Sequence, residues 1–95
     1  KGSWGRDFLD QYMSDEVDSL EEYAVDRTRN EYGLELSENQ KEDLYFGITS
    51  IMAGVKFGNR TQAERGCEEL ALIDTDLAKD AAEYLDGISE TGYWA

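Results

Sequence analysis

Apolar side chains recur along most of the chain at steps of three and four residues, the spacing that places them on one face of an α-helix. The pattern predicts a first helical stretch over residues 4–32, in which Ser14 and Asp15 mark a candidate interruption because Ser and Asp favour N-caps. Gly33 follows as a candidate helix stop. The apolar positions of this stretch are Phe8, Tyr12, Met13, Val17, Leu20 and Ala24, with Thr28 as a candidate next position.

The start of the next predicted helix is marked more clearly. Ser37 and Gln40 have the spacing of a capping box, with Ser at the N-cap and Gln three residues later. The helix they begin should reach Phe57, and its inward positions are Leu44, Ile48, Ile51, Met52 and Val55. Tyr45, Phe46 and Phe57 broaden the apolar surface, which predicts that this helix is the buried centre of the domain. Gly47 and Gly54 lie seven residues apart, where close approach of a neighbouring backbone would offset their low helix propensity.

Two further helices complete the prediction. Gly58 and Asn59 should end the central helix, and residues 61–64 read as a second capping box that begins the next one. Its inward positions are Ala63, Cys67, Leu70 and Ala71. Asp74 or Thr75 should cap the last helix, whose end is loosened by Gly87 and Gly92. Its inward positions are Leu77, Ala81, Tyr84, Leu85 and Ile88. We therefore expect an all-α fold, a compact bundle of four or five helices, with residues 1–95 as one domain.

The charge narrows the range of partners. The chain of 95 residues carries 22 acidic and 9 basic side chains, a net charge of −13. The segments 1–33, 34–58 and 59–95 carry −5, −2 and −6, so the negative charge concentrates toward both ends of the sequence. Such a charge repels nucleic acid and anionic lipid and attracts basic protein surfaces. We expect a basic protein as partner, with no direct contact to nucleic acid or membrane.

The composition also narrows the chemistry. There is no histidine, the commonest general base, and the single cysteine, Cys67, rules out an internal disulfide. No apolar run reaches the length of a membrane span, and the polar opening segment 1–10 lacks a secretory signal pattern. Residues 1–3 are typical of a cloning remnant. These features predict a cytoplasmic protein that is not an enzyme, has no catalytic residue, metal or cofactor, and uses Cys67 as a small core residue.

Acidic residues at helical spacing are the main candidates for partner binding. They form two rows, Asp15, Asp18 and Glu22 near one end of the chain and Asp76, Asp80 and Glu83 near the other. Glu64 and Glu68 form a shorter pair. Like charges at this spacing destabilise a helix slightly, so the rows are either a solvated face or a surface that imitates nucleic-acid phosphates.

Trp4, Tyr93 and Trp94 lie near the chain ends and have two interpretations. They either clamp the termini over the core or form an exposed aromatic anchor for a partner. We include Trp4 and Trp94 among the candidate partner-binding residues.

These features together predict an acidic helical binding protein, a stoichiometric inhibitor that covers the basic nucleic-acid-binding surface of another protein. In size, acidity and helicity the chain resembles small phage counter-defence proteins (anti-restriction and anti-CRISPR inhibitors) and the acidic immunity proteins paired with nuclease toxins, although no motif supports the resemblance. One alternative is a small Mg-dependent hydrolase of the helical nucleotide pyrophosphohydrolase type, in which Glu64 and Glu68 with Asp80 and Glu83 would hold the metal. The spacing of these four residues differs from the tighter E-x-x-E and E-x-x-D pattern of those enzymes. The other alternative is a self-associating adaptor domain.

Overall fold

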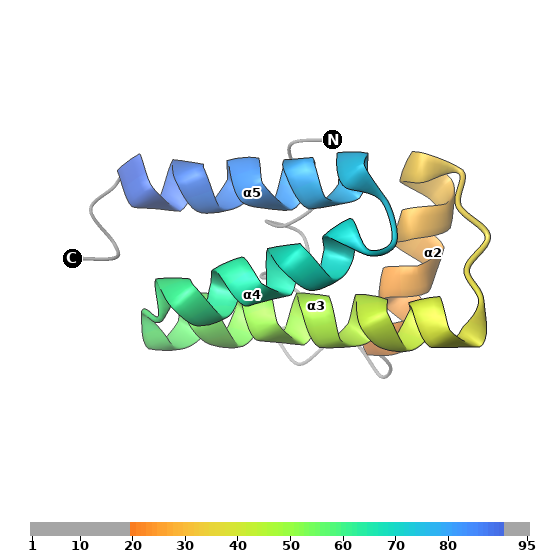
Figure 1. The fold of residues 1–95 in the computed structure, drawn as a ribbon, viewed down its shortest axis with the longest axis horizontal. Coiled ribbons are helices and arrows are strands. Elements are labelled where there is room, and N and C mark those ends of the chain that lie inside the picture. The colour runs from red at the N-terminus through yellow and green to blue at the C-terminus, as the bar shows by residue number, and fades with distance from the viewer. Residues whose placement is uncertain (1–19, 91–95) are drawn as a thin grey trace.

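The computed structural model describes residues 20–90, and within them the side chains of residues 22–89. Four helices make up this part of the chain: α2 (Leu20–Tyr32), α3 (Glu38–Phe57), α4 (Arg60–Ala71) and α5 (Thr75–Glu90). Figure 1 shows α4 between α3 and α5, with α2 running steeply across the end at which α3 and α5 begin. The all-α compact bundle is thus confirmed. The earlier part of the first predicted helix and the residues after Glu90 lie outside the described residues.

Glycine and a capping box set the boundary between α2 and α3 as the sequence predicts. Gly33 has a positive φ of +67°, and its N–H donates to the carbonyl oxygen of Arg29 at 2.9 Å. The N–H of Gln40 donates to Ser37 Oγ at 3.2 Å, and the N–H of Ser37 donates to Gln40 Oε1 at 2.9 Å. Both halves of the capping box are therefore present.

The start of α4 differs from the prediction. Its N-cap is Asn59, whose Oδ1 accepts a hydrogen bond from the N–H of Gln62 at 3.1 Å, so Thr61 lies inside the first turn. The reason is local. Gly58 leaves α3 in the left-handed conformation (φ +69°), and Asn59 follows it with an extended backbone, the geometry an N-cap requires. The helix can therefore begin two residues before the predicted capping box would allow.

At α5 the structure decides between two predicted caps. Asp74 Oδ2 accepts the N–H of Leu77 at 3.0 Å, so Asp74 is the cap and Thr75 is the first helical residue. α5 continues through Gly87 to Glu90, so the predicted inward position Ile88 lies within the helix; Gly92 lies outside the described residues.

The core is a single cluster of buried side chains to which all four described helices contribute. The five inward positions predicted for α3 are all buried, and Ile48 and Ile51 expose no surface. Ala24 and Thr28 of α2 are buried as well, as are Leu77, Ala81 and Leu85 of α5. The predicted inward face of α3 is therefore buried, but the prediction that the bundle surrounds α3 is wrong, because α4 is the helix that lies between α3 and α5.

Glycines permit the closest helix contact in the described part of the chain, between α3 and α4. A Cβ on Gly54 would stand 2.6 Å from the backbone nitrogen of Ala63, and one on Gly47 would stand 2.7 Å from Leu70 Cδ2. Gly66 completes the contact from α4, facing the backbone of Gly47 and the side chain of Ile51. The close approach expected at Gly47 and Gly54 is confirmed, whereas the sequence analysis did not single out Gly66.

The outer side of the α3–α4 pair is more apolar than predicted. Tyr45, Phe46 and Phe57 are 39%, 59% and 74% exposed, so they are not part of the core. Helix geometry explains the difference, because each residue turns the side chain by about 100° and Phe46 therefore points away from the side occupied by Leu44. On α4, Ala71 is exposed instead of inward and Cys67 is only half-buried.

Candidate partner-binding surface

The acidic row on α5 contains two kinds of carboxylate. Asp80 is half-buried and accepts a hydrogen bond from the Tyr32 hydroxyl at 2.5 Å, which ties α5 to the end of α2. Burial, followed by the hydrogen bond to Asp80 and the charge of that carboxylate, raises the pKa of Tyr32 well above its usual range. Asp76 and Glu83 are exposed. Of the three predicted residues in this row, two face solvent and one holds two helices together.

Only part of the other predicted sites can be placed. Glu22 is exposed near the start of α2. Asp15, Asp18, Trp4 and Trp94 lie outside the described residues, so the first acidic row and the aromatic anchor remain predictions.

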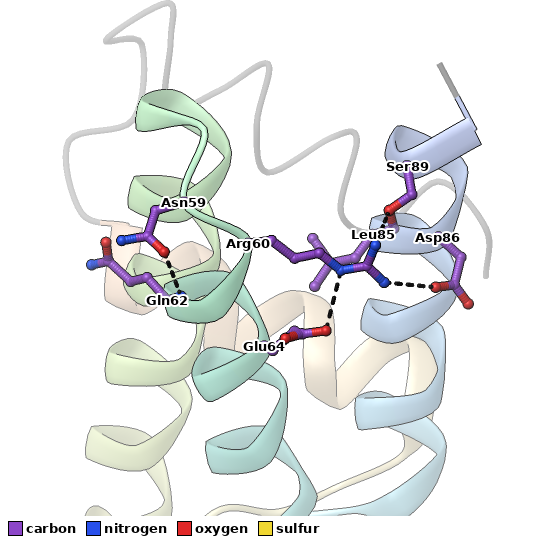
Figure 2. A network of polar contacts seen from close by, with 7 residues as sticks. All are labelled: Asn59, Arg60, Gln62, Glu64, Leu85, Asp86 and Ser89. Carbon is purple, nitrogen blue, oxygen red and sulfur yellow. Dashed lines mark hydrogen bonds and ion pairs between the residues drawn. The ribbon is translucent and has the colours of Figure 1, made fainter. Parts of the chain in front are cut away.

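Arg60 forms ion pairs with two carboxylates, one on α4 and one on α5. Figure 2 shows its guanidinium lying between α4 and α5, with Nε 3.2 Å from Glu64 Oε2 and Nη2 3.7 Å from Asp86 Oδ1. Its Nη1 donates to Ser89 Oγ at 2.7 Å, and that hydroxyl donates in turn to the carbonyl oxygen of Leu85 at 3.1 Å. Glu64 is therefore partly neutralised, and the predicted pair Glu64 and Glu68 is not a uniform acidic site.

A second group of carboxylates forms no ion pair and no side-chain hydrogen bond with the described side chains. Its members are Glu35, Glu42, Asp43, Glu68, Glu69, Asp76 and Glu83. They lie on the linker before α3 and on the outer sides of α3, α4 and α5. Five of the seven are exposed, and Asp43 and Glu69 are half-buried. Carboxylates that form no ion pair leave their charge available to an approaching molecule.

An open groove runs between the outer sides of α3 and α4. It has a volume of about 610 Å³ and is lined by Phe46, Ser50, Arg65, Glu68, Glu69 and Leu72. Leu72 is 71% exposed. The rings of Phe46 and Tyr45 meet edge to face, with centroids 6.2 Å apart. The sequence analysis did not predict this groove. Phe46 follows the inward Leu44 by two residues, and this spacing predicts that Phe46 faces outward.

Cys67 lacks the environment of a nucleophile. Burial, followed by the charges of Glu64, Asp86 and Glu68, raises its pKa to about 11. The thiol is therefore neutral at physiological pH, whereas the nucleophilic form is the thiolate.

Within residues 20–90, no group of three or more cysteine and acidic side chains is arranged to hold a metal ion. No helix in that range is long and apolar enough to cross a membrane. No family model matches the chain, and neither the curated proteins nor the solved structures contain one that is similar to it.

Proposed function

We propose that this protein is a stoichiometric inhibitor that covers a basic nucleic-acid-binding surface of another protein. The observation that carries the proposal is the set of exposed carboxylates without ion pairs, among them Asp76 and Glu83 on α5 and Glu68 on α4. The net charge of −13 has the same sign as that of a nucleic acid, so both would compete for one basic surface.

The rigidity of the helices supports this role. Asp76 and Glu83 are seven residues apart on α5, which separates them by about 10 Å along the helix axis. Asp74 caps this helix at one end, and Tyr32 and Arg60 hold it against α2 and α4. Carboxylates on a fixed frame lose less conformational entropy on binding than carboxylates on a flexible chain. Counter-defence and toxin immunity are the classes of inhibitor that we propose, with action in the cytoplasm.

A second candidate, the self-associating adaptor, is supported by the exposure of Phe46, Phe57 and Leu72. Apolar side chains on a surface are typical of contacts between proteins. The net charge of −13 opposes contact between two copies, and we therefore rank this candidate second.

Capture from bacterial lysate at rising salt tests the proposed function, followed by an activity assay of the captured protein. We expect a basic nucleic-acid-handling protein that is lost as salt rises and is inhibited at equal molar amounts. A partner that survives high salt, or one whose activity does not change on binding, would contradict the proposal.

Charge reversal then asks whether binding uses a defined face. Asp76→Lys with Glu83→Lys changes the charge of α5 by four units, and Glu68→Lys with Glu69→Lys makes the same change on α4. Asp80 stays unchanged in both variants because it holds Tyr32. One variant should lose binding while the other largely retains it. Equal, modest losses would instead indicate a general effect of net charge.

A further inference from the structure

The α3–α4 groove combines apolar and acidic side chains on one surface. Phe46 and Leu72 line it from the two helices, and both are more than half exposed. Their apolar surface contributes nothing to the core while it faces water. Burying it against a partner would be favourable, because apolar surface would be removed from water.

Two carboxylates line the groove and a third lies one helical turn from Phe46. Glu68 and Glu69 line the groove and precede Leu72 by four and three residues, which places them one helical turn away. Glu42 precedes Phe46 by four residues on the same side of α3. None of these three carboxylates forms an ion pair. Arg65 also lines the groove, one helical turn before Glu68 and Glu69, so the acidic side chains of this surface outnumber the basic one.

We propose that this groove anchors the partner by taking one large apolar side chain between Phe46 and Leu72, from a protein segment that carries Lys or Arg on either side of that residue. The proposal deepens the proposed function and rests on it, because it names the chemistry of the segment that the acidic protein recognises. Charge complementarity selects this occupant. A second copy of the chain would bring its own net charge of −13 to a rim that is already acidic.

The two parts of the groove have separate physical roles. The carboxylate rim attracts a basic segment over a distance set by the salt concentration and accelerates its approach. The apolar centre holds the segment once water is expelled, and so acts mainly on the dissociation rate. An entirely polar basic segment would use only the first of these contributions and should bind weakly.

Two synthetic peptides test the proposal. Each is a Lys/Ala peptide of about 16 residues, long enough to form some helix. The first carries one Phe at its centre with Lys on either side, and the second carries Ser in place of that Phe with the same charge. Titrated into the isotopically labelled full chain, the first peptide should shift the amide signals of residues 46–50 and 65–72 in NMR spectra. It should bind at least tenfold more tightly than the second.

Variants of exposed residues provide the matched comparison. Phe46→Ser and Leu72→Ser should each weaken binding of the first peptide at least tenfold. Phe57→Ser should leave binding unchanged, because Phe57 is 74% exposed but does not line the groove. Glu68→Lys with Glu69→Lys should abolish binding, and thermal melts check that every variant stays folded.

Several results would overturn the groove proposal. They are equal binding of the two peptides, signal shifts confined to α5, and no binding of either peptide at low salt. Sedimentation showing a dimer that Leu72→Ser dissociates would assign the groove to a second copy, and nuclear Overhauser contacts from Phe46 to residues 1–19 would assign it to this chain itself. The proposed function can fail separately: the peptide can bind in the groove while no nucleic-acid-handling protein is inhibited.

Discussion

Cys67 illustrates how one side chain depends on charges from more than one helix. Its thiol is half-buried on α4, and the carboxylates that disfavour its ionisation come from α4 and from Asp86 on α5. The folded pKa of about 11 lies above the unfolded value, so folding favours the neutral thiol. This contribution to stability is fully present below the unfolded pKa of about 9 and is lost as pH rises through about 11.

We therefore predict that alkylation of Cys67 by iodoacetamide is slow in the folded protein at neutral pH. Its rate should rise with pH toward a midpoint near 11, whereas the denatured chain should show a midpoint near 9. Measurement of the rate against pH in both states checks this, with Cys67→Ser as the unreactive control. Rapid labelling of the folded protein at neutral pH would show that the thiol is activated.

The helices show which interactions sequence periodicity can reveal. The capping box at Ser37 and the inward positions of α3 depend on residues within a few turns of each other, and both were predicted correctly. The N-cap of α4 was misplaced because Asn59 and Thr61 both suit that role, and only the backbone leaving Gly58 distinguishes them. The hydrogen bond between Tyr32 and Asp80 joins residues 48 apart, so local pattern carries no sign of it.

We predict opposite effects from the same substitution at two glycines, one at the α3–α4 contact and the other on α5. Gly66→Ala places a Cβ 2.7 Å from Ile51 Cγ1 and should cost about 1–3 kcal/mol of unfolding free energy. Gly87→Ala, with nothing within 4 Å, should stabilise the protein by about 0.5–1 kcal/mol through better helix propensity. Denaturant titration of both variants measures the difference. Equal effects would show that α3 and α4 are not in close contact.

On the scale of the whole molecule, excess negative charge acts against folding. The chain carries 22 acidic and only 9 basic side chains, and several of the described carboxylates form no ion pair. Compaction brings these like charges together, which raises the free energy of the folded state. The acidic surface that suits a basic partner therefore lowers the free energy of unfolding.

The melting temperature should consequently rise with salt. Increasing NaCl from about 10 mM to about 100 mM shortens the Debye length from about 30 Å to about 10 Å and screens much of the repulsion. We expect an increase of several degrees, measured by circular dichroism, and no further change when a chelator is added. A fall in melting temperature with chelator would favour the alternative of a metal-dependent hydrolase.

The short connection through Gly58 and Asn59 also has a consequence for folding kinetics. It joins α3 and α4, the two helices that share the largest interface of the described residues. Because the connection is short, the contacts between them form with little loss of loop-closure entropy. We infer that the α3–α4 hairpin assembles first and that α2 docks later, through contacts such as Tyr32 with Asp80. In stopped-flow experiments Leu70→Ala should therefore slow refolding, whereas Tyr32→Phe should mainly accelerate unfolding. The reverse pattern would place α2 in the folding nucleus.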